Sequence, residues 1–308
     1  MLSMKTITIG EHVFKVKDYY CDDGDGYITR KNSNLWLYIN ISDICNAHCP
    51  FCINPCRCDG NTSFSIDSFR ETLYRIKDHI SGISITGGEP MLYPELVDEV
   101  LGVINEAFKQ YIETDIVTNG FNFSEIKKLK HLDDLDSIHL SRHMINDYEN
   151  NRIFGIPVVS SAEIKDIVSG LSDPAKVVFN CILMKNGIDT VERIADYLEF
   201  AADVQVSNAS FIGMAKVNSF CIENYVDPAG LDFSKDPRFT IWNRFHDHEY
   251  CKCSSGSYKA ESRSVRFYYR CIGNQIVPYA RQLVYTADNR LLAGFNGKEI
   301  HLRQNEAI

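Results

Sequence analysis

Short apolar runs alternate with helix-like stretches from about residue 34 onward. The runs have strand length and lie at 35–41, 82–86, 111–118, 137–140, 176–183 and 204–207. Between them, apolar side chains recur every three or four positions, as Ile66, Phe69 and Leu73 do, which is typical of one face of an amphipathic helix. Six strand–helix steps of this kind indicate a parallel α/β fold, either a barrel or an open sheet.

Local signals place several helix starts within this pattern. Ser65 precedes a helix-like stretch and is expected to cap it. Capping boxes, in which two residues three positions apart exchange hydrogen bonds at a helix start, are predicted at Asn122/Glu125, Ser160/Glu163 and Asp189/Glu192. Each of these helices would follow a predicted strand, as a parallel sheet requires.

Both flanks of the 34–214 core have a different pattern. Residues 1–33 form a short β lead-in, in which 5–9 and 12–16 are expected to pair as a hairpin. After about residue 214 the alternation breaks down, so 215–308 is interpreted as a C-terminal extension. Within it, Asp236-Pro237 could open a short helix to about His246, whereas 264–270 and 282–286 resemble strands.

Composition restricts the class of protein. The chain has 308 residues, of which 44% are hydrophobic and 24% charged, as in an ordinary globular protein. The formal charge of −9 argues against broad binding to nucleic acid or membrane surfaces. No uninterrupted apolar stretch reaches the length of about eighteen residues that spans a membrane, and the N-terminus lacks the apolar segment of a signal peptide. We therefore expect a cytoplasmic protein.

The cysteines indicate metal or redox chemistry. There are eleven, an odd number, and they cluster mainly at 45–58 and 251–271, which differs from a secreted disulfide framework. Cys45, Cys49 and Cys52 have C-x3-C-x2-C spacing, which can hold one face of a cubane iron–sulfur cluster and leave one iron open. Two alternatives are a structural zinc site with a fourth ligand and the triplet of Cys49, Cys52 and Cys56.

Further candidate residues fall at or near the predicted strand ends. These are the cysteine loop itself, the Gly87–Pro90 segment, Asn119, Ser141 to His143, and Asn180. In parallel α/β folds, ligands bind at the carboxyl ends of the strands. The pattern therefore predicts one shared site.

Two motifs in this order are similar to those of a known family. The CNAHCPFC loop after the first strand and ITGGEP at the end of the second resemble the radical S-adenosylmethionine (SAM) enzymes. The hallmark of that family is C-x3-C-x-aromatic-C, and Phe51 fills the aromatic position. The resemblance covers roughly residues 35–210 and implies a partial (β/α)6 TIM-like barrel, here with the N-terminal β element and a C-terminal cap.

The resemblance also implies a mechanism and a set of site residues. A [4Fe–4S] cluster on Cys45, Cys49 and Cys52 would bind the amino and carboxylate groups of SAM and cleave it to a 5′-deoxyadenosyl radical, which abstracts hydrogen from substrate. Phe51 would lie against the adenine, and the Gly87–Pro90 backbone would meet the amino acid end of SAM. The full set of expected SAM contacts is Phe51, Gly87, Gly88, Glu89, Pro90, Asn119, Ser141, Arg142 and Asn180. An arginine fork such as that of Arg142 suits a carboxylate.

Two residues are candidates for direct catalytic roles. His143 could touch substrate or act as an acid or base near neutral pH, although a packed histidine at a strand end is an equal interpretation. Cys181 could face the barrel interior and donate a hydrogen atom to a substrate radical, or it could be a small core residue.

An auxiliary iron–sulfur cluster is a further hypothesis, because many peptide-modifying members of the family carry one. Cys251, Cys253 and Cys271 are its candidate ligands, with a fourth from elsewhere, such as Cys58 or Cys221. Cys56 and Cys58 could instead be free thiols.

The compact chain favours a small-molecule or short-peptide substrate, with electrons from a donor such as flavodoxin or ferredoxin. Two alternatives are a maturase of ribosomally made peptides and a non-catalytic metal-binding or electron-transfer protein on the same fold.

Overall fold

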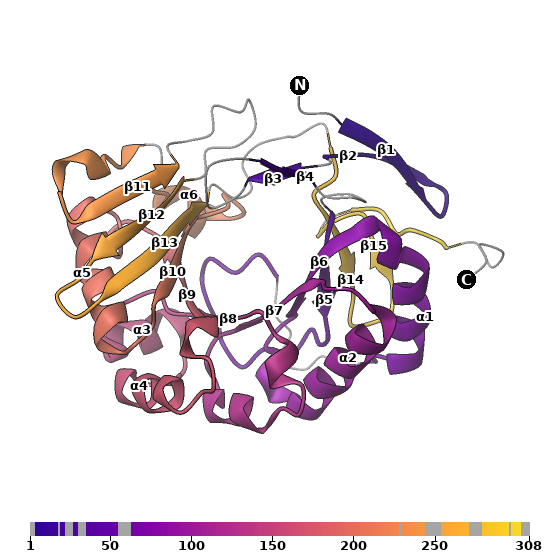
Figure 1. The fold of residues 1–308 in the computed structure, drawn as a ribbon, viewed down its shortest axis with the longest axis horizontal. Helices are drawn as coiled ribbons and strands as arrows, with labels where there is room; N and C mark the ends of the chain where they lie inside the picture. The colour runs from indigo at the N-terminus through magenta and orange to yellow at the C-terminus, as the bar shows by residue number, and fades with distance from the viewer. Residues whose placement is uncertain are drawn as a thin grey trace.

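The computed structural model describes residues 4–17, 19–21, 27–29, 35–54, 63–227, 230–243, 254–270, 279–295 and 297–302. The strands of the main sheet form an inner wall, and the helices α1 to α5 lie around its outer side (Figure 1). This arrangement is the barrel-like α/β fold that the alternating pattern predicts.

The predicted six-strand core is present, except that the sixth strand begins at Asn208 and not at Val204, and each strand pairs in parallel with the next. The strands are β5 (Leu35–Asn40), β6 (Ile80–Thr86), β7 (Glu113–Thr118), β8 (Ser137–Ser141), β9 (Val177–Leu183) and β10 (Asn208–Gly213). Because all six run the same way, their carboxyl ends meet at one rim of the barrel.

Helices cover the outer face of this wall. The α-helices are α1 (Ile66–Ile76), α2 (Pro94–Ala107), α3 (Asp147–Phe154), α4 (Ser161–Ser169), α5 (Val191–Asp203) and α6 (Ser219–Glu223). Short 3-10 turns lie at η1 (Lys77–His79), η2 (Pro90–Leu92), η3 (Phe123–Lys128), η4 (Leu132–Asp134), η5 (Pro174–Lys176) and η7 (Phe233–Lys235). The apolar stripe of α1 buries Phe69, Leu73 and Ile76, and the main core lies between the helices and the outward-facing strand positions.

The region after residue 214 extends the sheet at both edges. β13 (Ser264–Arg270) pairs in parallel with β10, and β12 (Ser254–Lys259) and β11 (Phe239–Asn243) continue that edge antiparallel. At the other edge, β14 (Gln282–Tyr285) pairs in parallel with β5 and is followed by β15 (Leu291–Leu292). Within the described ranges, β11 and β15 do not pair with each other, so the sheet curls without closing.

The N-terminal lead-in contains two hairpins. β1 (Met4–Ile9) pairs with β2 (His12–Lys17), as predicted, and β3 (Tyr19–Cys21) pairs with β4 (Tyr27–Thr29). Val16 forms a parallel bridge to Ala280, which attaches the first hairpin to the C-terminal region. Among the described residues, no helix is long and apolar enough to cross a membrane.

Helix caps were predicted with mixed accuracy. Ser65 caps α1 and the Ser160/Glu163 capping box starts α4, so both predictions are confirmed. The capping box at Asn122 is wrong, because Asn122 has a left-handed backbone with φ of 52° and its side chain makes no cap hydrogen bond to the 3-10 turn that follows. At α5 the N-cap is Thr190 instead of the predicted Asp189, because the Thr190 hydroxyl accepts from the Arg193 N–H.

The helix predicted after Asp236-Pro237 is also wrong. The Asp236 carboxylate accepts from the Arg238 backbone and side chain, which forms a turn. Phe239 then begins β11, where it pairs with Tyr258 of β12 and packs on Phe267. Burial of aromatic side chains against the sheet overrides the local helix signal here.

Candidate active site

The glycine-rich end of β6 is attached directly to the cysteine loop that follows β5. The Gly88 N–H donates to the Ser42 carbonyl at 2.6 Å, and the Glu89 N–H donates to the Ile44 carbonyl at 2.9 Å. Gly87 has a φ of 140°, a conformation that L side chains rarely adopt. A side chain at Gly88 would overlap the Ile44 carbonyl. Both glycines are therefore required for the close approach of the two segments.

This close approach predicts a measurable effect of Gly88→Ala. The added methyl group would meet backbone atoms of Ile44 and Cys45, which cannot move without displacing the cysteine loop. Overpacking of this kind costs about 1–3 kcal/mol, so we expect about ten-fold weaker SAM binding and a lower iron content after reconstitution. Gly230→Ala is the matched control, since among the described residues, its chain neighbours aside, no atom lies within 4 Å of the added carbon. Equal iron and SAM affinity in both variants would contradict the prediction.

The Glu89 carboxylate joins the ends of β6 and β7. Glu89 is 1% exposed, and its carboxylate accepts from the Met91 N–H at 2.9 Å, the Thr118 hydroxyl at 2.6 Å and the Asn119 N–H at 2.7 Å. Burial raises the pKa of Glu89 to about 7, although the three donors oppose that shift. The carboxylate thus fixes the end of β7 against the Gly87–Pro90 segment.

Asn119 connects β7 to the cysteine loop. Its side-chain N–H₂ donates to the Asn46 side-chain oxygen at 2.9 Å and lies 3.9 Å from the Cys45 sulfur. Asn119 is therefore more than a turn residue, because its amide group contacts the loop that carries the three cysteines.

The three thiols occupy a partly desolvated loop. Cys45 is buried, and Cys49 and Cys52 are half-buried. The Ala47 N–H lies 3.4 Å from the Cys45 sulfur and the Cys52 thiol donates to the Asn54 carbonyl at 2.9 Å. Burial raises the pKa of Cys49 to about 12, and the proximity of Cys52 and Cys45 adds to the shift. Thiolates in such a place require a cation to stabilise them.

Phe51 and His143 belong to an aromatic cluster at the cysteine loop. The two rings pack edge to face with centroids 4.8 Å apart, and His143 stacks on Phe154 at 5.0 Å. The His143 Nδ1 accepts from the Ile182 N–H at 3.2 Å. Burial, assisted by the Arg142 charge, lowers the pKa of His143 to about 3. The ring contacts with Phe51 and Phe154 and the hydrogen bond from Ile182 support the packed interpretation of His143.

The depressed pKa predicts a pH dependence of stability. The unfolded histidine takes up a proton below pH 6.5 whereas folded His143 stays neutral down to about pH 3. The unfolded state therefore binds more protons in this window, and stability falls as the pH falls. We expect this residue to lower the free energy of unfolding at pH 5 by about 2 kcal/mol relative to neutral pH. His143→Asn keeps an acceptor for the Ile182 N–H. Its free energy of unfolding in urea should not show this decrease with falling pH. An equal pH dependence of stability in the wild type and the variant would contradict the assignment.

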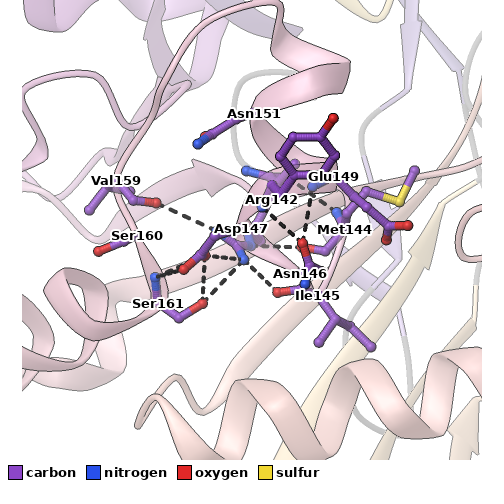
Figure 2. A network of polar contacts seen from close by, with 12 residues as sticks. Arg142, Met144, Ile145, Asn146, Asp147, Glu149, Asn151, Val159, Ser160 and Ser161 are labelled. Atoms are coloured by element: carbon purple, nitrogen blue, oxygen red, sulfur yellow. Dashed lines mark hydrogen bonds and ion pairs between the residues drawn. The ribbon is translucent and has the colours of Figure 1, made fainter.

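Arg142 lies in a protein network at the end of β8 (Figure 2). It is 1% exposed. Its guanidinium donates to the carbonyls of Met144 at 2.7 Å, Ile145 at 2.5 Å and Val159 at 3.5 Å, and to the Asp147 carboxylate at 2.7 Å and the Ser161 hydroxyl at 3.2 Å. These bonds use the guanidinium group that was expected to bind a SAM carboxylate. The geometry therefore indicates a structural role for Arg142 instead of a SAM contact.

Ser141, Asn180 and Cys181 lie at neighbouring positions on β8 and β9. Ser141 and Asn180 are in register and half-buried on the inner face. Cys181 has the opposite orientation, is fully buried in the helix-facing core, and interacts with Tyr197 of α5. Burial raises its thiol pKa. The structure therefore supports the small-core interpretation of Cys181 instead of a hydrogen-atom donor in the interior.

Comparisons with known proteins define the family. Residues 39–201 match the Radical SAM superfamily. The GTP 3',8-cyclase of Campylobacter jejuni subsp. doylei is 28% identical over 174 residues, which cover 54% of this chain and 52% of that enzyme. The chain thus spans about half the length of the relatives that it matches. Since the superfamily match covers more than half of the sequence, the chain belongs to the radical SAM superfamily of enzymes.

Solved structures agree with this fold. Streptococcus suis SuiB bound to precursor peptide SuiA aligns with a TM-score of 0.58 at 16% identity, covering 86% of this chain and 61% of SuiB. SuiB bound to S-adenosylmethionine aligns with a TM-score of 0.55 at 15% identity, covering 86% of this chain and 62% of SuiB. At this identity the similarity concerns the fold.

The family implies SAM and a [4Fe–4S] cluster, and the donor set fits a cluster. Three soft sulfur ligands lie on one loop, with N–H groups of Ala47 and Asn119 directed at Cys45. Among the described residues, no three His, Cys, Asp or Glu side chains converge tightly enough for a single metal ion.

Several predicted cysteines lie outside the described residues. These are Cys56, Cys58, Cys251, Cys253 and Cys271. Cys221 is described and is buried beside Phe51, Met184 and Met214. The auxiliary cluster therefore stays a prediction.

The sequence interpretation missed Asn46 and Thr118, which link the strand ends to the cysteine loop. Both are polar residues directly beside predicted site residues, which is the signal that could have identified them.

Proposed function

We propose that Cys45, Cys49 and Cys52 hold a [4Fe–4S] cluster and that the Gly87–Pro90 segment binds the amino acid end of SAM beside it. The observation that carries this proposal is the direct hydrogen bonding of the glycine-rich segment to the cysteine loop at Ser42 and Ile44. These bonds hold glycine backbone against the start of the loop that carries the three thiols, and such backbone leaves room for a ligand to approach an open iron.

The surrounding residues have supporting roles in this proposal. Glu89 fixes the glycine-rich segment, and Asn119 orients the loop near Cys45. Phe51 offers a ring for the adenine, while its stack with His143 and Phe154 keeps water from one side of the site. Ser141 is the last residue of β8 and Asn180 is in the middle of β9. Their register on the inner face supports them as further contacts of SAM.

Bound together, the cluster and SAM supply a carbon-centred radical that takes hydrogen from a substrate. The substrate is a small molecule or short peptide, and the electron comes from a donor such as flavodoxin or ferredoxin.

The test is anaerobic reconstitution with iron and sulfide, followed by dithionite and SAM, with 5′-deoxyadenosine measured by chromatography. We expect SAM-dependent formation of 5′-deoxyadenosine. Full cluster loading without SAM cleavage would contradict the proposal and favour a non-catalytic metal-binding or electron-transfer protein.

A second candidate is the modification of a ribosomally made peptide, with an auxiliary cluster. The long structural overlap with the peptide-bound SuiB, over 86% of this chain, favours it. Iron counting separates the candidates, because one cluster gives about four irons per chain and two give about eight. Loss of the extra iron in a variant with Cys251, Cys253 and Cys271 changed to alanine would assign the second cluster to these residues.

A further inference from the structure

The Cys45 sulfur lies among N–H groups that the protein itself supplies. The Ala47 backbone N–H donates to it at 3.4 Å, and the Asn119 side-chain N–H₂ donates to it at 3.9 Å. Cys45 and Asn119 are each 7% exposed, so water competes little for these contacts. Hydrogen bonds to the sulfur ligands help to set the reduction potential of an iron–sulfur cluster. The two donors therefore bear on the electron chemistry of the site as well as on its shape.

The orientation of the Asn119 amide group follows from its partners. Its side-chain oxygen accepts from the Phe121 N–H at 2.8 Å, which fixes which end of the amide carries the nitrogen. An amide nitrogen has two hydrogens. One of them is donated to the Asn46 side-chain oxygen at 2.9 Å, and the other is left for Cys45.

The backbone at Asn119 is held in place as well. The Asn119 backbone N–H donates to the buried Glu89 carboxylate at 2.7 Å, and the Thr118 hydroxyl donates to the same carboxylate at 2.6 Å. Backbone and side chain of Asn119 are thus both fixed by protein partners. A donor that is positioned in advance stabilises new charge without rearranging first.

The three thiols of the loop have different polar surroundings. The Cys52 thiol donates to the Asn54 carbonyl at 2.9 Å, and a carbonyl oxygen does not stabilise negative charge on a sulfur atom. Among the described residues, no side-chain amide donates to the Cys49 sulfur. The side-chain donor at Cys45 therefore acts on one ligand of the cluster.

We propose that Asn119 raises the reduction potential of the cluster through its hydrogen bond to Cys45. Reduction adds one electron, supplied by the electron donor, and no bond forms or breaks. Part of the added negative charge lies on the sulfur ligands. A hydrogen bond strengthens as its acceptor becomes more negative, so the Asn119 N–H stabilises the reduced cluster more than the oxidised one. The inference rests on the proposed function and assigns Asn119 the role of making the cluster easier to reduce.

Three variants isolate this hydrogen bond. Asn119→Ser keeps an oxygen that can accept from the Phe121 N–H but lacks the N–H₂ group that reaches Cys45. Asn119→Asp keeps the shape and the acceptor of the side chain but replaces the donor with a negative charge. Asn180→Ser is the matched control, because the Asn180 side-chain oxygen lies 3.1 Å from the His139 ring. In the described part of the chain, Asn180 bonds to no thiol.

The measurement is a redox titration of each reconstituted protein without SAM, with the paramagnetic resonance signal of the reduced cluster as the readout. Asn119→Ser should lower the ratio of reduced to oxidised cluster about ten-fold at a fixed potential, which is about 59 mV for a one-electron couple. Asn119→Asp should lower the potential further, because its carboxylate adds negative charge near the sulfur. Asn180→Ser should have the potential of the wild type.

Equal potentials of the wild type and Asn119→Ser, with about four irons per chain in both, would overturn the inference. An equal decrease in Asn119→Ser and Asn180→Ser would also overturn it, because the effect would then not depend on Cys45. If Asn119→Ser does not hold the cluster, Asn119→Asp decides, since it has the size of the native side chain; an unchanged potential there would overturn the inference. Loss of iron from both Asn119 variants would assign Asn119 a structural role instead.

An assay of 5′-deoxyadenosine on the same samples separates this inference from the proposed function. A potential that falls in Asn119→Ser, in a protein that does not cleave SAM, would refute the proposed function alone. SAM cleavage with equal potentials in the wild type and Asn119→Ser would refute the role of Asn119 alone. A wild type that binds no cluster would refute both.

Discussion

Changing Cys45, Cys49 or Cys52 to alanine is expected to abolish SAM cleavage. The three thiols lie on one loop, and burial and mutual proximity already raise the pKa of Cys49 to about 12. Only a bound metal centre would keep them ionised together. Loss of a ligand should exceed the 10- to 100-fold effect of losing an outer-shell partner, so we expect 5′-deoxyadenosine formation to fall more than about 100-fold. Iron should fall from about four per chain to near zero.

Cys221→Ala and Cys181→Ala are matched controls for these variants. Both residues are fully buried cysteines, Cys221 beside Phe51 and Cys181 beside Tyr197. Their loss should lower stability but leave iron content and SAM cleavage close to those of the wild type. Loss of iron in Cys221→Ala, with iron retained in Cys45→Ala, would show that the cluster is held by a different set of thiols.

The strands of the core could be predicted because several of these parallel strands are buried along most of their length. Such strands, here β6, β9 and β10, appear in the sequence as apolar runs. Local capping chemistry also gave correct starts at Ser65 and Ser160. The start at Asn122 failed because its left-handed backbone turns the chain into a 3-10 segment. Contacts with other parts of the chain determine such a backbone conformation, and the periodicity of apolar residues does not reveal them.

The candidate site could be predicted where its segments follow neighbouring strands. It was predicted less well where a side chain bonds to residues of another segment. The cysteine loop and Gly87–Pro90 follow consecutive strands, so their proximity follows from parallel topology. Arg142 was expected to contact SAM because it follows the fourth predicted strand, where the family resemblance implies such contacts, and because an arginine fork suits a carboxylate. Its actual partners, including Asp147 and Val159, come from the chain that follows β8.

The second large effect is expected for Arg142→Met. Removing this buried charge leaves the Met144 and Ile145 carbonyls without their donor, whereas the 42% exposed Asp147 carboxylate keeps its bonds from Ser161. Each lost bond from a charged donor costs about 1.5–3 kcal/mol, so we expect the free energy of unfolding measured in urea to fall by about 3–5 kcal/mol. For Asp147, burial alone would raise the pKa, but the bonds from Ser161 and Arg142 outweigh it, so the pKa is lowered. The pair therefore also loses stability as the pH falls through the acidic range.

Arg238→Met is the control for this prediction. Arg238 bonds to Asp236 at 2.7 Å and lies 3.7 Å from Glu199, but its side chain is 48% exposed, so its removal should cost less than about 1 kcal/mol. The structural assignment also requires that Arg142→Met, at a temperature where it stays folded, binds SAM nearly as well as the wild type. A large loss of SAM affinity with little loss of stability would show instead that the guanidinium leaves its protein partners to bind the ligand. Stability and affinity together therefore decide whether Arg142 supports the site or belongs to it.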